Sequence, residues 1–178
     1  MPLITSRLVE FTTPWFDVVA KRTNVDESPY YSLRMPDCVS VIALTPGEQV
    51  VLVRQYRPAV ERYTLELPSG QVEANETPEQ SARRELAEET GYRAQSMEFL
   101  GVLLTDTGRH ENRSWCYLAA MVTPIDAGYD PEPGIERVLI HRSALFEMIA
   151  KGEFDHALHL GVLALGLAKR GRDLLGIT

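Results

Sequence analysis

Cysteine is scarce in this chain of 178 residues, which contains only Cys38 and Cys116 and no Cys-x-x-Cys pair. A redox motif or a structural zinc site is therefore not expected. Long apolar runs are also lacking, because the run at residues 158–168 is interrupted by Gly161 and Gly166 and is too short to span a bilayer. The amino terminus has no basic segment followed by a long apolar stretch, so we expect no signal peptide. These absences favour a cytoplasmic protein that does not bind a membrane.

Positive charge is also limited. Lys and Arg number 18 against 25 Asp and Glu, which gives a net charge of −7. We find no stripe of basic residues that would follow a nucleic-acid backbone, so no nucleic-acid partner is expected. An acidic protein can still bind phosphate esters when a divalent cation lies between the two sets of negative charge. The length and the 44% hydrophobic content are typical of one compact globular domain.

Short β-rich segments separated by turn residues run through most of the chain. The expected strands are residues 7–12, 16–22, 30–34, 39–45, 50–55, 63–67, 97–104, 114–122 and 137–141. A hairpin is expected at residues 46–49. Two helices are expected at the end, Ala144–Lys151 with Ser143 as N-cap and His156–Arg170 with Asp155 as N-cap. Strands with interspersed helices predict an α/β fold, a mixed sheet covered by helices.

One helix has clear signals at both ends. Thr77 is a suitable N-cap, Pro78 suits the first helical position, and Gln80 completes a capping box. Gly91 stands where a left-handed residue would end the helix. The sequence therefore predicts a helix over residues 79–90, with a narrow apolar stripe and a heavily charged surface.

Three glutamates share one face of this helix. Glu85, Glu88 and Glu89 are spaced at i, i+3 and i+4, so their carboxylates lie together and repel each other. Taken alone, such a cluster is more often a solvated surface. A hard divalent cation that prefers oxygen ligands, Mg²⁺ or Mn²⁺, would neutralise it.

The setting of these glutamates favours the metal site. Gly70, Glu76 and residues 84–92 (Arg-Glu-Leu-Ala-Glu-Glu-Thr-Gly-Tyr) resemble the Nudix box, Gly-x5-Glu-x7-Arg-Glu-U-x-Glu-Glu-x-Gly-U with U bulky and apolar. The resemblance implies the Nudix fold, a mixed sheet sandwiched between helices, and a Mg²⁺-dependent hydrolase. It implies that Glu85, Glu88 and Glu89 ligate the ions, with the carbonyl of Ser69 as a further ligand. Arg84 would orient the glutamates, and Glu76 would anchor the loop.

The similarity extends to a subgroup. Residues 53–58, 65–70 and 152–155 resemble the corresponding segments of ADP-ribose and nucleoside-diphosphate-sugar pyrophosphatases. That resemblance implies that Arg57 contacts phosphate and that Glu66 helps to bind the substrate or the partner subunit. The implied products are a nucleoside monophosphate and a sugar phosphate. GDP-mannose, dinucleoside polyphosphates and nucleoside triphosphates are alternative substrates, and a non-catalytic nucleotide-sugar sensor is a further alternative.

One departure from the subgroup concerns the loop at residues 106–113. Thr107 replaces a proline that these enzymes commonly carry, which weakens the preference for ADP-ribose. Arg109 in this loop is a candidate contact to phosphate or sugar, with a solvated turn residue as the alternative.

The general base is expected on a loop that closes over the metals, as in related enzymes. Residues 128–136 form that loop by position, and Glu132 is the first candidate within it. Glu111 and Glu136 remain alternatives, and Glu85 is included among the catalytic residues.

Residues 1–37 are expected to form a β extension separate from the Nudix domain at residues 38–178. In enzymes of this subgroup such strands cross to a second subunit, so the resemblance implies a homodimer.

Trp15, Tyr30 and Tyr31 either stack on a base or pack in the core or interface. His156 and His159 are three residues apart on the last expected helix, which usually indicates packing or surface exposure.

Overall fold

The computed structural model describes residues 1–125, 129 and 132–176. Its elements follow the expected order with few differences. The strands are β1 (Ile4–Thr12), β2 (Asp17–Thr23), β3 (Tyr30–Arg34), β4 (Cys38–Leu44), β5 (Gln49–Arg57), β6 (Arg62–Glu66), β7 (Ser69–Gln71), β8 (Tyr92–Arg93), β9 (Glu98–Leu104), β10 (Arg113–Ala120), β11 (Thr123–Pro124) and β12 (Ile135–His141). The helices are α1 (Pro78–Thr90), α2 (Arg142–Ala150), α3 (Ala157–Arg170) and the 3₁₀ turn η1 (Arg172–Leu175).

The main sheet is mixed, as expected. Its strand order is β12-β5-β4-β10-β9, with β6 paired to β5 and β7 paired to β4. Strand β10 runs parallel to β4, whereas β12 and β5 are antiparallel. Strand β4 pairs with β5 only at Ala43 and Leu44, and its other end pairs with β7 through residues 38–40. Strand β4 therefore changes partner along its length, and the end that pairs with β7 lies beside α1, where the Ser69 N–H donates to Glu89.

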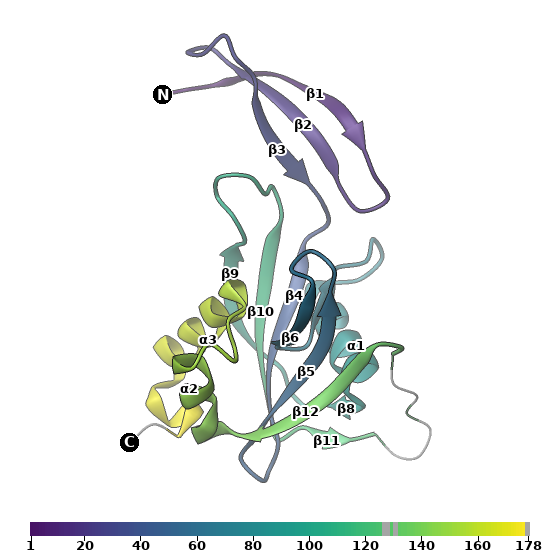
Figure 1. Cartoon of the computed structure of the whole chain (residues 1–178), viewed down its shortest axis with the longest axis vertical. Helices are drawn as coiled ribbons and strands as arrows, with labels where there is room; N and C mark the ends of the chain where they lie inside the picture. The colour runs from purple at the N-terminus through teal and green to yellow at the C-terminus, as the bar shows by residue number, and fades with distance from the viewer. Residues whose placement is uncertain (126–128, 130–131, 177–178) are drawn as a thin grey trace.

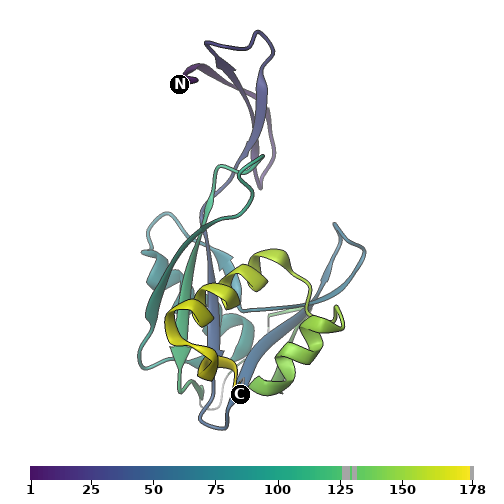
Figure 2. The ribbon, with the colours of Figure 1, turned by 90° about the vertical axis from the view of Figure 1, so that its left-hand side faces the viewer.

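Helices cover both faces of this sheet (Figures 1 and 2). Helix α1 lies on one face, above a cluster that includes Val39, Val41 and Leu86. Helices α2 and α3 lie on the other, above a cluster that includes Leu52 and Phe154. The expected three-layer α/β/α Nudix architecture is therefore confirmed. None of the helices in the described ranges is both long and apolar enough to cross a bilayer.

The amino-terminal strands form a separate three-stranded antiparallel sheet, β1-β2-β3, which stands away from the main body in both views (Figures 1 and 2). It connects to the body through the link from β3 to β4 and through the loop between β9 and β10. In that loop His110 forms a β-bridge with Leu33. Every residue of β1 is exposed, including Leu8 and Phe11, each 62% exposed.

Several local expectations were wrong. The N-caps of α2 and α3 are His141 and His156, whose Nδ1 atoms accept from backbone N–H groups, rather than Ser143 and Asp155. Strand β12 begins at residue 135, so Glu136 belongs to a strand and not to the expected loop. Within that loop, residues 128, 130 and 131 lie outside the described residues. The short strands β7, β8 and β11 were not expected.

Candidate active site

Helix α1 is built as the sequence predicts. The Thr77 hydroxyl accepts from the Gln80 N–H, and the Gln80 side chain accepts from the Thr77 N–H at 2.8 Å, which completes the capping box. Gly91 ends the helix with a φ of 68°, in the left-handed region that glycine adopts without strain. These local signals fix which turn of α1 carries the glutamates.

The three glutamates of α1 differ in burial. Glu85 and Glu89 are 9% and 4% exposed, whereas the Glu88 side chain is 53% exposed. The carboxyl group of Glu85 lies against Gly70, where any Cβ would overlap it. The N–H of Ser69 donates to Glu89 Oε2 at 2.9 Å. The carboxylates of Glu85 and Glu89 therefore lie against the first two residues of β7, Ser69 and Gly70.

Arg84 connects the carboxylates of this region. Its Nη1 lies 2.8 Å from Glu85 Oε1 and 2.9 Å from Glu88 Oε2. Its Nε donates to Glu76 at 3.1 Å, and its Nη2 donates to the Gln71 carbonyl at 3.1 Å. Arg84 therefore bonds to Glu85, Glu88 and Glu76 at once. Its expected role in orienting metal ligands, and that of Glu76 in anchoring the loop, stay predictions.

The negative charges of the two buried carboxylates, Glu85 and Glu89, are unfavourable without a cation. Burial, together with the charges of Glu85 and Glu132, raises the pKa of Glu89 to about 8. Burial also raises the pKa of Glu85, although Arg84 opposes the shift. A buried carboxylate is stable as an anion only when it is paired or bound to a metal. The exposed Glu88 and the two buried carboxylates together supply the hard oxygen ligands that Mg²⁺ or Mn²⁺ prefers.

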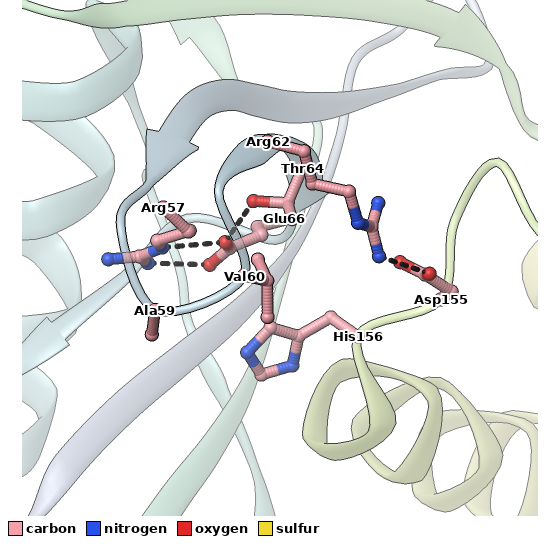
Figure 3. A pocket seen from close by; sticks show the side chains of 8 residues that line it. All are labelled: Arg57, Ala59, Val60, Arg62, Thr64, Glu66, Asp155 and His156. Atoms are coloured by element: carbon pink, nitrogen blue, oxygen red, sulfur yellow. Dashed lines mark hydrogen bonds and ion pairs between the residues drawn. The ribbon is translucent and has the colours of Figure 1, made fainter.

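Arg57 and Glu66 form a bidentate ion pair on neighbouring strands (Figure 3). Arg57 Nε and Nη2 lie 2.8 and 2.6 Å from the two Glu66 carboxylate oxygens, and the Thr64 hydroxyl donates to Glu66 at 2.6 Å. Glu66 is fully buried, and although burial raises its pKa, the bonds from Arg57 and Thr64 lower it to about 2. The charge of Arg57 also lowers the pKa of Glu89, so the guanidinium lies in the field of the glutamates. Glu66 therefore fixes the plane of the Arg57 guanidinium through both of its carboxylate oxygens.

The candidates for the general base lie in different surroundings. The charge of Glu132 raises the pKa of both Glu85 and Glu89, which places it near them. Glu136 instead pairs with Arg54 at 3.1 Å on the sheet. The structure therefore brings Glu132 towards the carboxylate cluster and engages Glu136 elsewhere.

The remaining candidates, Glu111 and Arg109, lie in the β9–β10 loop against the amino-terminal sheet. Glu111 pairs with Lys21 at 2.8 Å and accepts from Ser32 at 2.6 Å. Although burial raises its pKa, these bonds and one from Arg34 lower it to about 2. Arg109 lies over the Tyr30 ring, 5.1 Å from its centroid. The geometry gives both residues a role in holding the extension to the body.

Sequence reasoning missed two contacts near the site. His159 is buried, and its Nδ1 accepts from the Leu67 N–H at 3.1 Å. Its burial could have been found from the i, i+3, i+4 spacing of His159, Val162 and Leu163, which are all buried on α3. The hydroxyl of Tyr129 donates to the Glu89 carbonyl at 3.0 Å, and no sequence signal pointed to this contact.

Comparisons with known proteins show which family the chain resembles. A family model described as the NUDIX domain matches residues 34–153. The chain is 35% identical to a methanol dehydrogenase activator of Bacillus methanolicus over 108 residues, and this match covers 60% of this chain and 58% of that protein. It is 33% identical over 94 residues to an ADP-ribose pyrophosphatase of Bacillus subtilis, covering 53% and 51%. It is 38% identical over 105 residues to an ADP-sugar pyrophosphatase of Mus musculus, covering 55% and 48%.

These matches span about half the length of the curated relatives. Among solved structures, an ADP compounds hydrolase superposes with a TM-score of 0.78 over 96% of both chains, at 23% sequence identity. At that identity the likeness concerns the fold, which here includes the amino-terminal sheet.

Proposed function

This chain belongs to the Nudix family, and on that premise we propose that it hydrolyses the pyrophosphate bond of ADP-ribose or another ADP-sugar with Mg²⁺ as cofactor. The observation that carries the proposal is the pair of buried carboxylates, Glu85 and Glu89, which lie against Gly70 and Ser69. They would supply negative ligands for a cation, and the half-buried Arg57, whose charge lowers the pKa of Glu89, would supply a positive ligand for a phosphate. The names of the relatives from B. subtilis and M. musculus support the substrate class.

The metal ligands that we propose are Glu85, Glu88 and Glu89, with the Ser69 carbonyl as a fourth. When bound, the ion supplies Lewis-acid polarisation of the pyrophosphate. Arg84 supports this site by holding Glu85 and Glu88 in place through Nη1. Mn²⁺ would satisfy the same oxygen ligands.

The chain's own residues bind the substrate and move the proton. Arg57 contacts a phosphate oxygen, and Glu66 fixes the plane of its guanidinium through two hydrogen bonds. Glu132 accepts a proton from the attacking water as the oxygen–phosphorus bond forms and the bridging phosphorus–oxygen bond breaks. The products are AMP and a sugar phosphate. The nearness of Glu132 to Glu85 and Glu89 supports its choice over Glu136.

We also propose that the protein is a homodimer formed through the amino-terminal sheet. Strand β1 exposes Leu8 and Phe11 at 62% each, and Trp15, which follows it, is 71% exposed. Several large apolar side chains exposed on and beside one strand support an interaction surface there. Sedimentation of the Phe11→Asp variant tests this, because a dimer held by β1 would dissociate and a monomeric wild type would refute it.

A substrate panel tests the activity. ADP-ribose, ADP-glucose, GDP-mannose, a dinucleoside polyphosphate and ATP are each incubated with Mg²⁺, and the products are resolved by phosphorus NMR. We expect AMP and sugar phosphate from the ADP-sugars at the highest kcat/KM. Preferential release of inorganic pyrophosphate from ATP would overturn the substrate class, and no turnover of any substrate would favour a non-catalytic nucleotide-sugar sensor.

A further inference from the structure

Three successive carbonyls at the carboxyl end of α1 each accept a hydrogen bond from a residue much later in the chain. They belong to Glu89, Thr90 and Gly91, and their donors are the Tyr129 hydroxyl, Arg137 Nη1 and the Ile125 N–H, at 3.0, 2.7 and 2.7 Å respectively. The end of a helix leaves its last carbonyls without partners inside the helix, so they need donors from elsewhere. All three donors lie within residues 125–137, and we call them the α1 clasp.

The ring of Tyr129 lies directly against Gly91. A Cβ at Gly91 would lie 2.7 Å from two atoms of that ring, so only glycine leaves room for the tyrosine. Gly91 also has a φ of 68°, in the left-handed region. The same glycine therefore ends the helix and makes space for the ring whose hydroxyl binds the Glu89 carbonyl.

Arg137 reaches the end of α1 from β12, the strand that lies beside this helix (Figure 1). Its guanidinium carbon lies 5.3 Å from the centroid of the Tyr92 ring and 5.9 Å from that of the Tyr129 ring. Helix α1 has no basic residue in its last turn, so Arg137 supplies the positive charge that the carboxyl end of a helix favours. Contacts with the two rings and with the Thr90 carbonyl fix that charge in place.

Glu132 lies between Tyr129 and Arg137 in the chain. It follows Tyr129 by three residues, and three residues of extended chain span about 11 Å at most. On its other side the Glu132 carbonyl accepts from the Ile135 N–H at 3.0 Å, in a turn that leads directly into β12. The backbone of Glu132 is therefore held near the end of α1 from both sides, and α1 is the helix that carries the three glutamates.

We propose that Tyr129 and Arg137 are positioning residues, which hold Glu132 within reach of the metal site by binding the main chain at the end of α1. The inference rests on the proposed function, in which Glu132 accepts the proton of the attacking water. Both side chains bind carbonyls, whereas the carboxylate of Glu89 accepts from the Ser69 N–H. Loss of either side chain should therefore disturb Glu132 and leave the metal ligands in place.

Two substitutions in the full-length protein test this role. Tyr129→Phe removes the hydroxyl and keeps the ring on Gly91, and Arg137→Gln removes the charge. We expect kcat for ADP-ribose to fall about fivefold in Tyr129→Phe and about tenfold in Arg137→Gln, as for the loss of one neutral and one charged hydrogen bond. KM and the affinity for Mn²⁺ should stay within about twofold of wild type, because neither substitution removes a ligand.

Two matched controls should leave kcat unchanged. Tyr63→Phe removes the hydroxyl of an exposed tyrosine on β6. Arg83→Gln removes a guanidinium of α1 that donates to a main-chain carbonyl, that of Ala94, at 2.8 Å.

A kinetic cycle with Glu132→Gln shows whether Tyr129 and Arg137 act through Glu132. In the Glu132→Gln background, Tyr129→Phe and Arg137→Gln should cause no further loss of kcat, because the group that they position is already gone. Equal losses in both backgrounds would overturn the inference. A fall in Mn²⁺ affinity that parallels kcat would also overturn it, since the α1 clasp would then only stabilise the helix that carries the ligands.

Hydrogen exchange at the Ile135 amide, followed by NMR, separates a failure of this inference from a failure of the proposed function. Exchange should be about fivefold faster in Tyr129→Phe and Arg137→Gln and unchanged in both controls, because the turn at Glu132 would open more often. If no substrate is hydrolysed but exchange is faster, the α1 clasp holds Glu132 while the proposed activity fails. Unchanged exchange would show that the inference is wrong, whether or not the protein is active.

Discussion

The carboxyl group of Glu85 occupies the space in which a side chain at Gly70 would begin. Gly70 lies in β7, and its backbone is not in the left-handed region, so glycine is required here for space and not for conformation. The reason for glycine at this position is therefore steric. The first glycine of the motif therefore sets where a proposed metal ligand can lie.

Substitution of Gly70 by alanine should displace Glu85 without unfolding the chain. Because the Cβ would overlap a ligand's carboxylate, we expect Mn²⁺ affinity or kcat to fall by about 10- to 100-fold, as for other residues that position ligands. Gly47→Ala is the control, since its Cβ would meet only Thr45 Oγ1 at 3.8 Å and Gln49 Oε1 at 4.0 Å, both ordinary contacts. Activity within twofold of wild type in Gly70→Ala would contradict this account of the site.

Substitutions in the Arg57–Glu66 pair should affect stability and activity differently. Arg57→Ala leaves a buried carboxylate without its partner, and we expect a loss of about 2 kcal/mol in the free energy of unfolding. Adding Glu66→Gln removes the unpaired charge and should restore most of that stability, whereas kcat/KM should stay low because the phosphate contact is absent. Urea unfolding and steady-state kinetics measure the two quantities. If the double variant recovered activity, Arg57 would not be a phosphate ligand.

The choice of general base predicts a clear order among three variants. Glu132→Gln should lower kcat by about 10²- to 10⁴-fold, the usual contribution of a general base, and leave Mn²⁺ affinity nearly unchanged. Glu136→Gln should retain activity because it pairs with Arg54 on the sheet. Glu111→Gln should chiefly loosen the amino-terminal sheet. A fully active Glu132→Gln alongside an inactive Glu136→Gln would reverse the assignment.

His159 should make the stability depend on pH in a defined window. Burial lowers its pKa to about 3 from an ordinary 6.5, so between these values the unfolded chain binds a proton that the folded chain does not. Its contribution to the free energy of unfolding therefore falls as pH decreases from 6.5 towards 3. Glu89, whose pKa in the folded chain is about 8, has the opposite effect, because it makes the free energy of unfolding decrease as pH rises from 4.5 to 8. Glu66 contributes to the pH dependence only below pH 4.5.

Comparison with His159→Asn isolates the contribution of His159 to the pH dependence of stability, since the amide oxygen of Asn can still accept from the Leu67 N–H. The stability advantage of wild type over the variant should shrink by roughly 2 kcal/mol between pH 6.5 and 5. Urea unfolding at several pH values provides the measurement. Parallel stability curves for the two proteins would show that His159 is not held neutral.

Local signals explain what was predictable. Thr77, Gln80 and Gly91 determine the ends of α1 through contacts within the helix and its adjoining residues, and the spacing of its glutamates then follows from helical geometry. The longer strands follow from β-rich segments between turns. Strands β8 and β11 have two residues each and exist because they pair with each other, which no local pattern records.

Long-range contacts explain what was missed. The sequence does not reveal that Glu66 is completely buried, because its burial depends on the hydrogen bonds that Arg57 and Thr64 donate to it. Helices α2 and α3 begin after the histidine N-caps His141 and His156, although the expected caps, Ser143 and Asp155, have the better intrinsic capping preference. Asp155, expected as a cap, instead pairs with Arg62.

Titration with Mn²⁺, followed by electron paramagnetic resonance, tests the central claim most directly. Wild type, Glu85→Gln and Glu89→Gln are compared with Glu79→Gln, a control on the same helix whose carboxylate pairs with Arg83. We predict that wild type and Glu79→Gln bind Mn²⁺ alike, and that each of the other two loses at least tenfold in affinity. Unchanged binding in Glu85→Gln and Glu89→Gln would show that these buried carboxylates do not hold the ion.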